Sequence, residues 1–167
     1  QLERTLRYAL ECSAGGSWAG INERLAAGPL AELPARAANF CTVHPLSYMP
    51  GTDTYQAAKE TLRFSPYPLH HDSFGSHLFG VNDFIRENWA FVFNPYVTHL
   101  PETTQRFYYS TLRLFNLLNA RPFHLALLAR MDRGQILPAL RKIVDRLGEE
   151  FVLAAKIEEF EKRAGEL

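Results

Sequence analysis

The stretch Ala38–Tyr55, A-N-F-C-T-V-H-P-L-S-Y-M-P-G-T-D-T-Y, decides the expected fold. The run Phe40–Leu46 is short, apolar and rich in residues that favour β-strands. Pro50 and the glycine after it predict a rigid turn, and Asp53 predicts the N-cap of a helix over Thr54–Leu62. A strand, a turn at its C-terminal end and a helix form the βα unit on which α/β barrels place ligand sites. The stretch therefore predicts an α/β fold, part of a barrel.

The rest of the chain reads as an α/β first part and a helical second part. Apolar residues three and four positions apart indicate amphipathic helices. The expected helices are Leu2–Cys12, Trp18–Ala27, Leu30–Ala37, Pro101–Ala120, Arg121–Asp132, Gln135–Leu147 and Glu149–Arg163, and a second strand is expected at Trp89–Phe93. The prediction is thus a partial α/β barrel segment over 1–100 and an all-helical C-terminal domain over 101–167.

Composition and charge exclude several classes of protein. Of the 167 residues 47% are hydrophobic and 22% charged, so the chain is expected to fold and not to be disordered. Basic and acidic residues number 18 each, which argues against a nucleic-acid partner. No apolar run reaches the roughly 18 residues of a membrane span. The two cysteines, Cys12 and Cys41, argue against a disulfide framework and favour a reducing, cytoplasmic setting.

The opening residues already have the character of the middle of a helix. Apolar residues follow helical spacing from Leu2 onward, but no N-cap residue precedes them. We therefore expect a piece of a longer protein, and the missing N-terminal part of the same protein is an expected partner.

Three groups of residues are candidates for chemistry. His44, at the end of the predicted strand, is either a pocket-facing acid, base or hydrogen-bond donor or a histidine bonded to a loop carbonyl. The run His70-His71-Asp72 has the residue types of a metal site, but adjacent histidines are poorly spaced ligands. Cys41 is expected to be a small buried hydrophobe.

Aromatic residues at helical spacing are expected in the core: Phe107, Tyr108, Tyr109, Phe115 and Phe123.

The turn Met49-Pro50-Gly51-Thr52, with the aromatic Tyr55 after it, resembles a late barrel strand of radical SAM enzymes. Residues 1–11, Q-L-E-R-T-L-R-Y-A-L-E, resemble the helix that follows the family's G-x-P-x-E-T type turn, and the turn itself would lie upstream of Gln1. The order of elements from His77 through Trp89–Phe93 to the helix at Pro101 resembles the tail of the cobalamin-associated type. The family's C-x-x-x-C-x-x-C cluster motif is absent from this sequence.

The resemblance implies the C-terminal part of a radical SAM-like enzyme, a cobalamin-dependent methyltransferase in its narrower form. It implies that His44, Ser47 and Tyr48 line the S-adenosylmethionine or substrate site. The 4Fe-4S cluster ligands would lie outside this chain, so the chain is not expected to be active alone. The implied cofactors are S-adenosylmethionine, the cluster and, in the narrower form, cobalamin, and the implied substrate is a small molecule or a peptide.

Two other functions remain open. One is a metal-dependent hydrolase that uses His70, His71 and Asp72. The other is a non-catalytic helical interaction module. Cluster cysteines encoded upstream would favour the radical SAM-like enzyme, and bound zinc or iron would favour the hydrolase. If neither metal nor cofactor binds, the interaction module is the remaining function.

Overall fold

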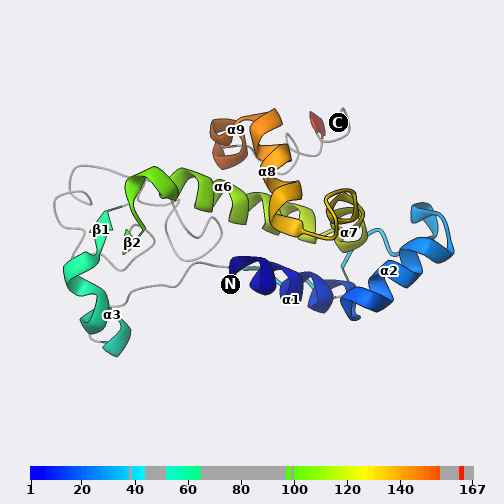
Figure 1. The fold of residues 1–167 in the computed structure, drawn as a ribbon, viewed down its shortest axis with the longest axis horizontal. Helices are drawn as coiled ribbons and strands as arrows, with labels where there is room; N and C mark the ends of the chain where they lie inside the picture. The colour runs from blue at the N-terminus through cyan, green and yellow to red at the C-terminus, as the bar shows by residue number, and fades with distance from the viewer. Residues whose placement is uncertain (38, 44–51, 65–96, 99, 155–161, 164–167) are drawn as a thin grey trace. The chain divides into compact units, whose positions relative to one another are not determined.

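The computed structural model describes residues 1–37, 39–43, 52–64, 97–98, 100–154 and 162–163, and over these ranges the chain is mainly helical (Figure 1). The strand pairing found among them joins β1 (Arg63–Phe64) to β2 (Val97–Thr98). This ladder is antiparallel and two residues long, whereas a βα barrel is built from longer parallel strands. The predicted partial β/α barrel is therefore wrong, and the described chain has a helical fold.

The chain divides into two compact units, 1–43 with 110–167 and 44–109. The first unit contains α1 (Leu2–Ala14), α2 (Trp18–Ala27), the 3-10 turn η1 (Leu30–Glu32), the C-terminal part of α6 (Glu102–Asn119), α7 (Pro122–Met131), α8 (Ile136–Leu147) and α9 (Glu149–Ala154). The second unit contains α3 (Asp53–Ala58), the 3-10 turn η2 (Lys59–Thr61), β1, β2 and the start of α6. The first unit thus contains helices from both ends of the sequence. The predicted domain boundary between residues 100 and 101 stays a prediction.

Local signals explain where α1 ends and α2 begins. Gly15 follows α1 with a φ of 67°, in the left-handed region that glycine tolerates, and its N–H donates to the carbonyl of Cys12 at 3.3 Å. Ser17 is the N-cap of α2, since its Oγ accepts a hydrogen bond from the N–H of Gly20 at 3.3 Å. The predicted range of this second helix, Trp18–Ala27, is confirmed.

The core of the first unit forms where α1, α7 and α8 meet. These three helices contact one another in every pairing, and α2 contacts both α1 and α7 (Figure 1). Each helix contributes side chains that are at most 1% exposed: Leu6, Leu10, Ile21, Phe123, Leu125, Ile136, Leu140 and Val144. Burial of one such side chain contributes roughly 1.5–3 kcal/mol. Three of the buried residues of α8, Ile136, Leu140 and Val144, recur every four positions and so lie on one face of the helix.

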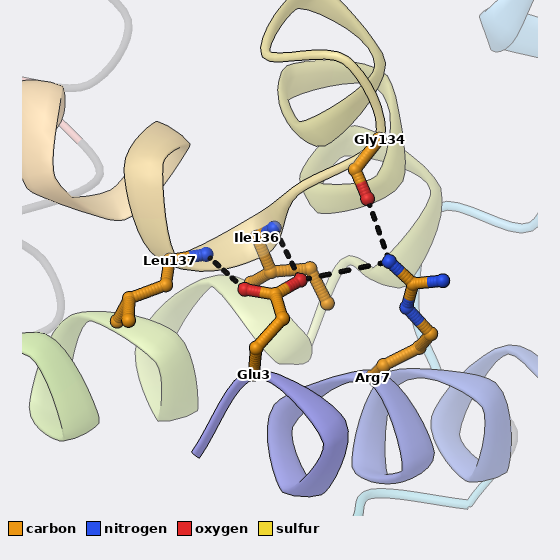
Figure 2. A network of polar contacts seen from close by, with 5 residues as sticks. All are labelled: Glu3, Arg7, Gly134, Ile136 and Leu137. Atoms are coloured by element: carbon orange, nitrogen blue, oxygen red, sulfur yellow. Dashed lines mark hydrogen bonds and ion pairs between the residues drawn. The ribbon is translucent and has the colours of Figure 1, made fainter. Parts of the chain in front are cut away.

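Glu3 of α1 caps the N-terminus of α8 (Figure 2). Its two carboxylate oxygens accept hydrogen bonds from the N–H groups of Ile136 and Leu137, each at 2.8 Å. The first N–H groups of a helix have no partner inside it, and α8 has no side-chain cap of its own. Beside this contact, Arg7 donates to the carbonyl of Gly134 at 2.9 Å and lies 3.7 Å from the Glu3 carboxylate. The first turn of α1 therefore holds the start of α8, although Glu3 and Ile136 are 133 positions apart.

Replacing Glu3 with alanine is expected to lower the free energy of unfolding by about 1–3 kcal/mol, because two helix N–H groups lose their acceptor. Urea denaturation followed by circular dichroism measures this loss. Glu23→Ala, at an exposed position of α2, is the matched control and is expected to change stability by less than about 0.5 kcal/mol. Equal losses in the two variants would show that the Glu3 contact does not cap α8.

In the second unit, Thr52 and not Asp53 caps α3. The Thr52 Oγ1 accepts a hydrogen bond from the N–H of Tyr55 at 3.2 Å, so the predicted N-cap is wrong by one residue. Threonine and aspartate are both good N-cap residues, so the sequence alone does not show which of the two neighbours, Thr52 or Asp53, caps the helix. The backbone conformation at Thr52 makes it the cap. Leu62 is 8% exposed and packs against Tyr55 and Ala58, which ties the end of η2 to α3.

Two predicted elements differ from the structure for clear reasons. The described part of the predicted strand Phe40–Leu46, residues 40–43, pairs with no strand. The predicted helix Leu30–Ala37 is only the short turn η1, which ends before Pro34, a residue that disfavours helix in its predecessor. The second predicted strand, Trp89–Phe93, lies outside the described residues.

Candidate functional site

Three side chains hold the residues that lead into the predicted site, and we call them the amide clamp (Ser13, Asn116 and Asn119). The N–H of Cys41 donates to the Ser13 Oγ at 3.0 Å, and the Cys41 carbonyl accepts from the Asn119 Nδ2 at 2.6 Å. The N–H of Val43 donates to the Asn116 Oδ1 at 2.8 Å, and its carbonyl accepts from the Asn116 Nδ2 at 2.9 Å. Side chains of α1 and α6 thus satisfy the backbone of two alternate residues.

Asn116 takes the place of a neighbouring strand. A carboxamide presents a donor and an acceptor in one plane, as a peptide group does. With Val43 it forms a reciprocal pair of hydrogen bonds like the pair that two opposite residues exchange in an antiparallel ladder. This pairing is the physical reason that an apolar, β-prone run is accommodated here without a sheet.

The clamp is buried at its centre. Asn119 is 0% exposed and Ser13 1% exposed, and the Asn119 Nδ2 also donates to the Ser13 Oγ at 2.8 Å. The Asn119 Oδ1 is buried without a hydrogen-bond partner among the described residues. A buried polar network fixes one arrangement, because other arrangements leave more polar groups unsatisfied. Neither carboxamides nor a serine hydroxyl titrate near neutral pH, so the clamp positions the backbone and supplies no acid or base.

The predicted site residues follow directly after the clamped backbone. His44, Ser47 and Tyr48 lie outside the described residues, so their role stays a prediction. The alternative metal site at His70, His71 and Asp72 lies outside them as well. The clamp fixes the backbone through Val43, the last described residue before His44.

Two cysteines and a tyrosine lie together beside the clamp. Both Cys12 and Cys41 are free thiols and partly exposed, so the expectation of a buried Cys41 is wrong. Burial, together with the neighbouring Cys12 thiol, raises the pKa of Cys41. A hydrogen bond with Cys12 is the main cause that raises the pKa of Tyr8, four residues earlier on α1. The Cys41 thiol is consequently protonated at neutral pH and is not an activated nucleophile.

The residues of this chain do not fit a 4Fe-4S cluster. Such a cluster is held by several cysteine thiolates, and the sequence has only two cysteines. Among the described residues, no three histidine, cysteine, aspartate or glutamate side chains are grouped as metal ligands. We derive no reaction step through a cluster in this chain.

Within the described ranges, no helix combines the length and the apolar character that crossing a membrane requires. Comparison with protein-family models, curated proteins and solved structures gives no match.

The amide clamp was not expected from the sequence, although a signal for it exists. Asn116 and Asn119 are three positions apart, which places them on one face of α6. They lie in the run Leu114–Ala120, which is otherwise apolar. Buried amide side chains need hydrogen-bond partners. Two amides on the apolar face of a predicted helix therefore indicate that the backbone of another segment packs against that face and bonds to them.

Proposed function

We propose that the chain is part of a radical SAM-like enzyme of the cobalamin-dependent methyltransferase type. In this proposal its helices form a scaffold, and not a barrel wall, that presents His44, Ser47 and Tyr48 to S-adenosylmethionine or to the substrate. The observation that supports it best is the amide clamp, which holds the backbone of Cys41 and Val43 directly before these residues. Catalytic groups need such support, because small displacements of a positioned group cost large factors in rate.

The proposal assigns the cluster to residues outside this chain. Bound S-adenosylmethionine and the cluster supply the radical chemistry, while the residues of this chain bind, orient and shield the reactants. The substrate is a small molecule or a peptide, and the N-terminal part of the same protein is the partner. We place the protein in the cytoplasm, where a reducing environment keeps Cys12 and Cys41 as the free thiols seen here.

The test begins with the DNA upstream of the codon for Gln1. A continuous reading frame that encodes three cysteines as C-x-x-x-C-x-x-C is the expected result. The encoded full-length protein, reconstituted anaerobically, is expected to bind S-adenosylmethionine, and His44→Ala is expected to raise its dissociation constant about three- to tenfold through the lost hydrogen bond. Isothermal titration calorimetry measures this change.

His124→Ala is the matched control, because His124 lies exposed on α7 and outside the proposed site. Its dissociation constant for S-adenosylmethionine is expected to equal that of the unchanged protein. A start codon immediately before the Gln1 codon or near it, or a full-length protein that binds no S-adenosylmethionine, would overturn the proposal.

A second candidate, the non-catalytic helical interaction module, is favoured by one surface feature. Leu127 is 38% exposed and Met131 77% exposed, and they lie four positions apart on α7. Residues at this spacing share a helix face, which is how helices dock into apolar grooves. Failure of the cofactor test would leave this candidate.

A further inference from the structure

Cys12 and Cys41 are brought together by contacts that do not involve their sulfur atoms. The N–H of Cys41 donates to the Oγ of Ser13, the residue next to Cys12, at 3.0 Å. Asn119 joins the same two partners, with its Nδ2 2.8 Å from the Ser13 Oγ and 2.6 Å from the Cys41 carbonyl oxygen. The backbone of Cys41 therefore lies beside the C-terminal end of α1. Within this arrangement the Cys12 thiol is close enough to the Cys41 thiol to contribute to the raised pKa of Cys41.

Both thiols are accessible to a reagent. Each cysteine is partly exposed, and neither forms a disulfide. Among the described residues, neither belongs to a group of side chains that could bind a metal ion. Tyr8, one turn before Cys12 on α1, is 67% exposed, so this side of the pair is open to solvent.

We propose that Cys12 and Cys41 form a reversible disulfide, a modification site that ties the backbone before His44 to α1. The proposal does not rest on the proposed enzymatic function, because it concerns two thiols that this chain itself contains. It fits a cytoplasmic protein as a response to oxidant, since disulfides in reducing compartments are transient.

The reaction uses a low-molecular-weight disulfide, oxidised glutathione, as the oxidant. The Cys12 thiolate attacks one sulfur of glutathione disulfide, which forms a mixed disulfide and releases one glutathione thiolate. The Cys41 thiol then loses its proton to solvent and attacks the Cys12 sulfur, which forms the Cys12–Cys41 bond and releases the second glutathione thiolate. Two protein thiols are oxidised by two electrons, and one glutathione disulfide is reduced to two glutathione molecules. We assign the first attack to Cys12, because burial keeps the Cys41 thiol protonated.

The amide clamp favours the second step. It holds residues that are 29 positions apart in the sequence side by side, so the effective concentration of one thiol at the other is high. Once formed, the bond closes this loop and lowers the entropy of the unfolded chain. Oxidation is therefore expected to raise the melting temperature by about 5 °C or more.

The experiment equilibrates the chain in glutathione buffers of graded ratio, traps the thiols by acid and alkylation, and identifies the products by mass spectrometry. The expected product is a monomer that has lost two hydrogen atoms and yields a Cys12–Cys41 cross-linked peptide. Added dithiothreitol is expected to restore both thiols. The single variants Cys12→Ser and Cys41→Ser are the matched controls, and each is expected to give only the mixed disulfide with glutathione.

Asn116→Ala tests the contribution of the clamp. This substitution removes only the partner of Val43 and leaves the contacts of Cys41 with Ser13 and Asn119 in place. The Cys12–Cys41 disulfide is therefore still expected to form, with the effective concentration of one thiol at the other lowered less than about tenfold. Two results would overturn the proposal. One is a wild-type chain that stops at mixed disulfides on both cysteines. The other is a disulfide that links two chains in place of the bond within one chain. Neither result bears on S-adenosylmethionine binding, so the two proposals fail separately.

Discussion

Replacing Phe115 with alanine is expected to lower the free energy of unfolding by about 3–5 kcal/mol. Phe115 lies in the part of α6 that belongs to the first unit, and its side chain is 0% exposed. Truncation removes the buried ring and leaves a cavity that the surrounding helices fill only in part. Single domains are commonly stable by only about 5–15 kcal/mol, so this one change removes a large fraction of the total.

The measurement is guanidinium denaturation followed by circular dichroism, with Phe40→Ala as the matched control. Phe40 is 56% exposed, and its truncation is expected to cost less than about 1 kcal/mol. If Phe115→Ala does not fold, Phe115→Leu keeps most of the apolar volume and is expected to lose about 1–2 kcal/mol. Similar losses for Phe115→Ala and Phe40→Ala would contradict the described core.

Replacing Asn119 with alanine is expected to cost about 2–4 kcal/mol, the second largest effect of a single substitution here. The change removes the donor to the Cys41 carbonyl, which loses its partner in a site where Asn119 is 0% exposed. It also removes one of the two hydrogen bonds to the Ser13 Oγ, which still accepts from the Cys41 N–H, and it leaves the space of the buried carboxamide empty. Each buried polar group that loses its partner costs about 1–3 kcal/mol.

Asn22→Ala is the matched control for this loss. The Asn22 Nδ2 donates to the carbonyl of Trp18 at 2.8 Å within α2, so its removal breaks a local contact and is expected to cost less than about 1 kcal/mol. Urea denaturation of both variants measures the difference. Equal losses would mean that the amide clamp does not hold the Cys41 backbone.

Asn119→Asp gives a pH-dependent version of the same test. A buried carboxyl group has a raised pKa, so the folded state keeps its proton where the unfolded state has lost it. The stability of this variant is therefore expected to fall as pH rises above the unfolded aspartate pKa of about 4. A variant whose stability relative to the unchanged protein is the same at all pH values would show that position 119 is open to water.

The helices were predictable from the sequence because their signals are local. Ser17 caps α2, Gly15 ends α1, and the buried face of α8 recurs every four residues, all of which can be identified without knowing what each helix contacts. Five aromatic residues were expected in the core from the same spacing, and burial is confirmed for Tyr109, Phe115 and Phe123. Phe107 and Tyr108 are only partly buried, so the expectation is wrong for these two.

The prediction of a strand at Phe40–Leu46 failed for the opposite reason. A strand is defined by the partner it pairs with, and the local sequence does not identify that partner. The apolar, β-prone residues around Cys41 and Val43 fit a sheet, but their backbone partners are the side chains of Ser13, Asn116 and Asn119. Those partners lie as many as 78 positions away in the sequence. Local propensity could not choose between a sheet neighbour and a helix that carries amides.

The contact between Glu3 and the start of α8 has a consequence for synthesis on the ribosome. A chain that grows at roughly 5–20 residues per second extends for about 7–27 seconds between the appearance of Glu3 and that of Ile136, which is 133 positions later. During this interval the N–H groups that the Glu3 carboxylate binds are missing, and for most of it α7 and α8, which pack against α1, are missing as well. The apolar face of α1 is therefore not fully covered on the nascent chain until α7 and α8 have been synthesised.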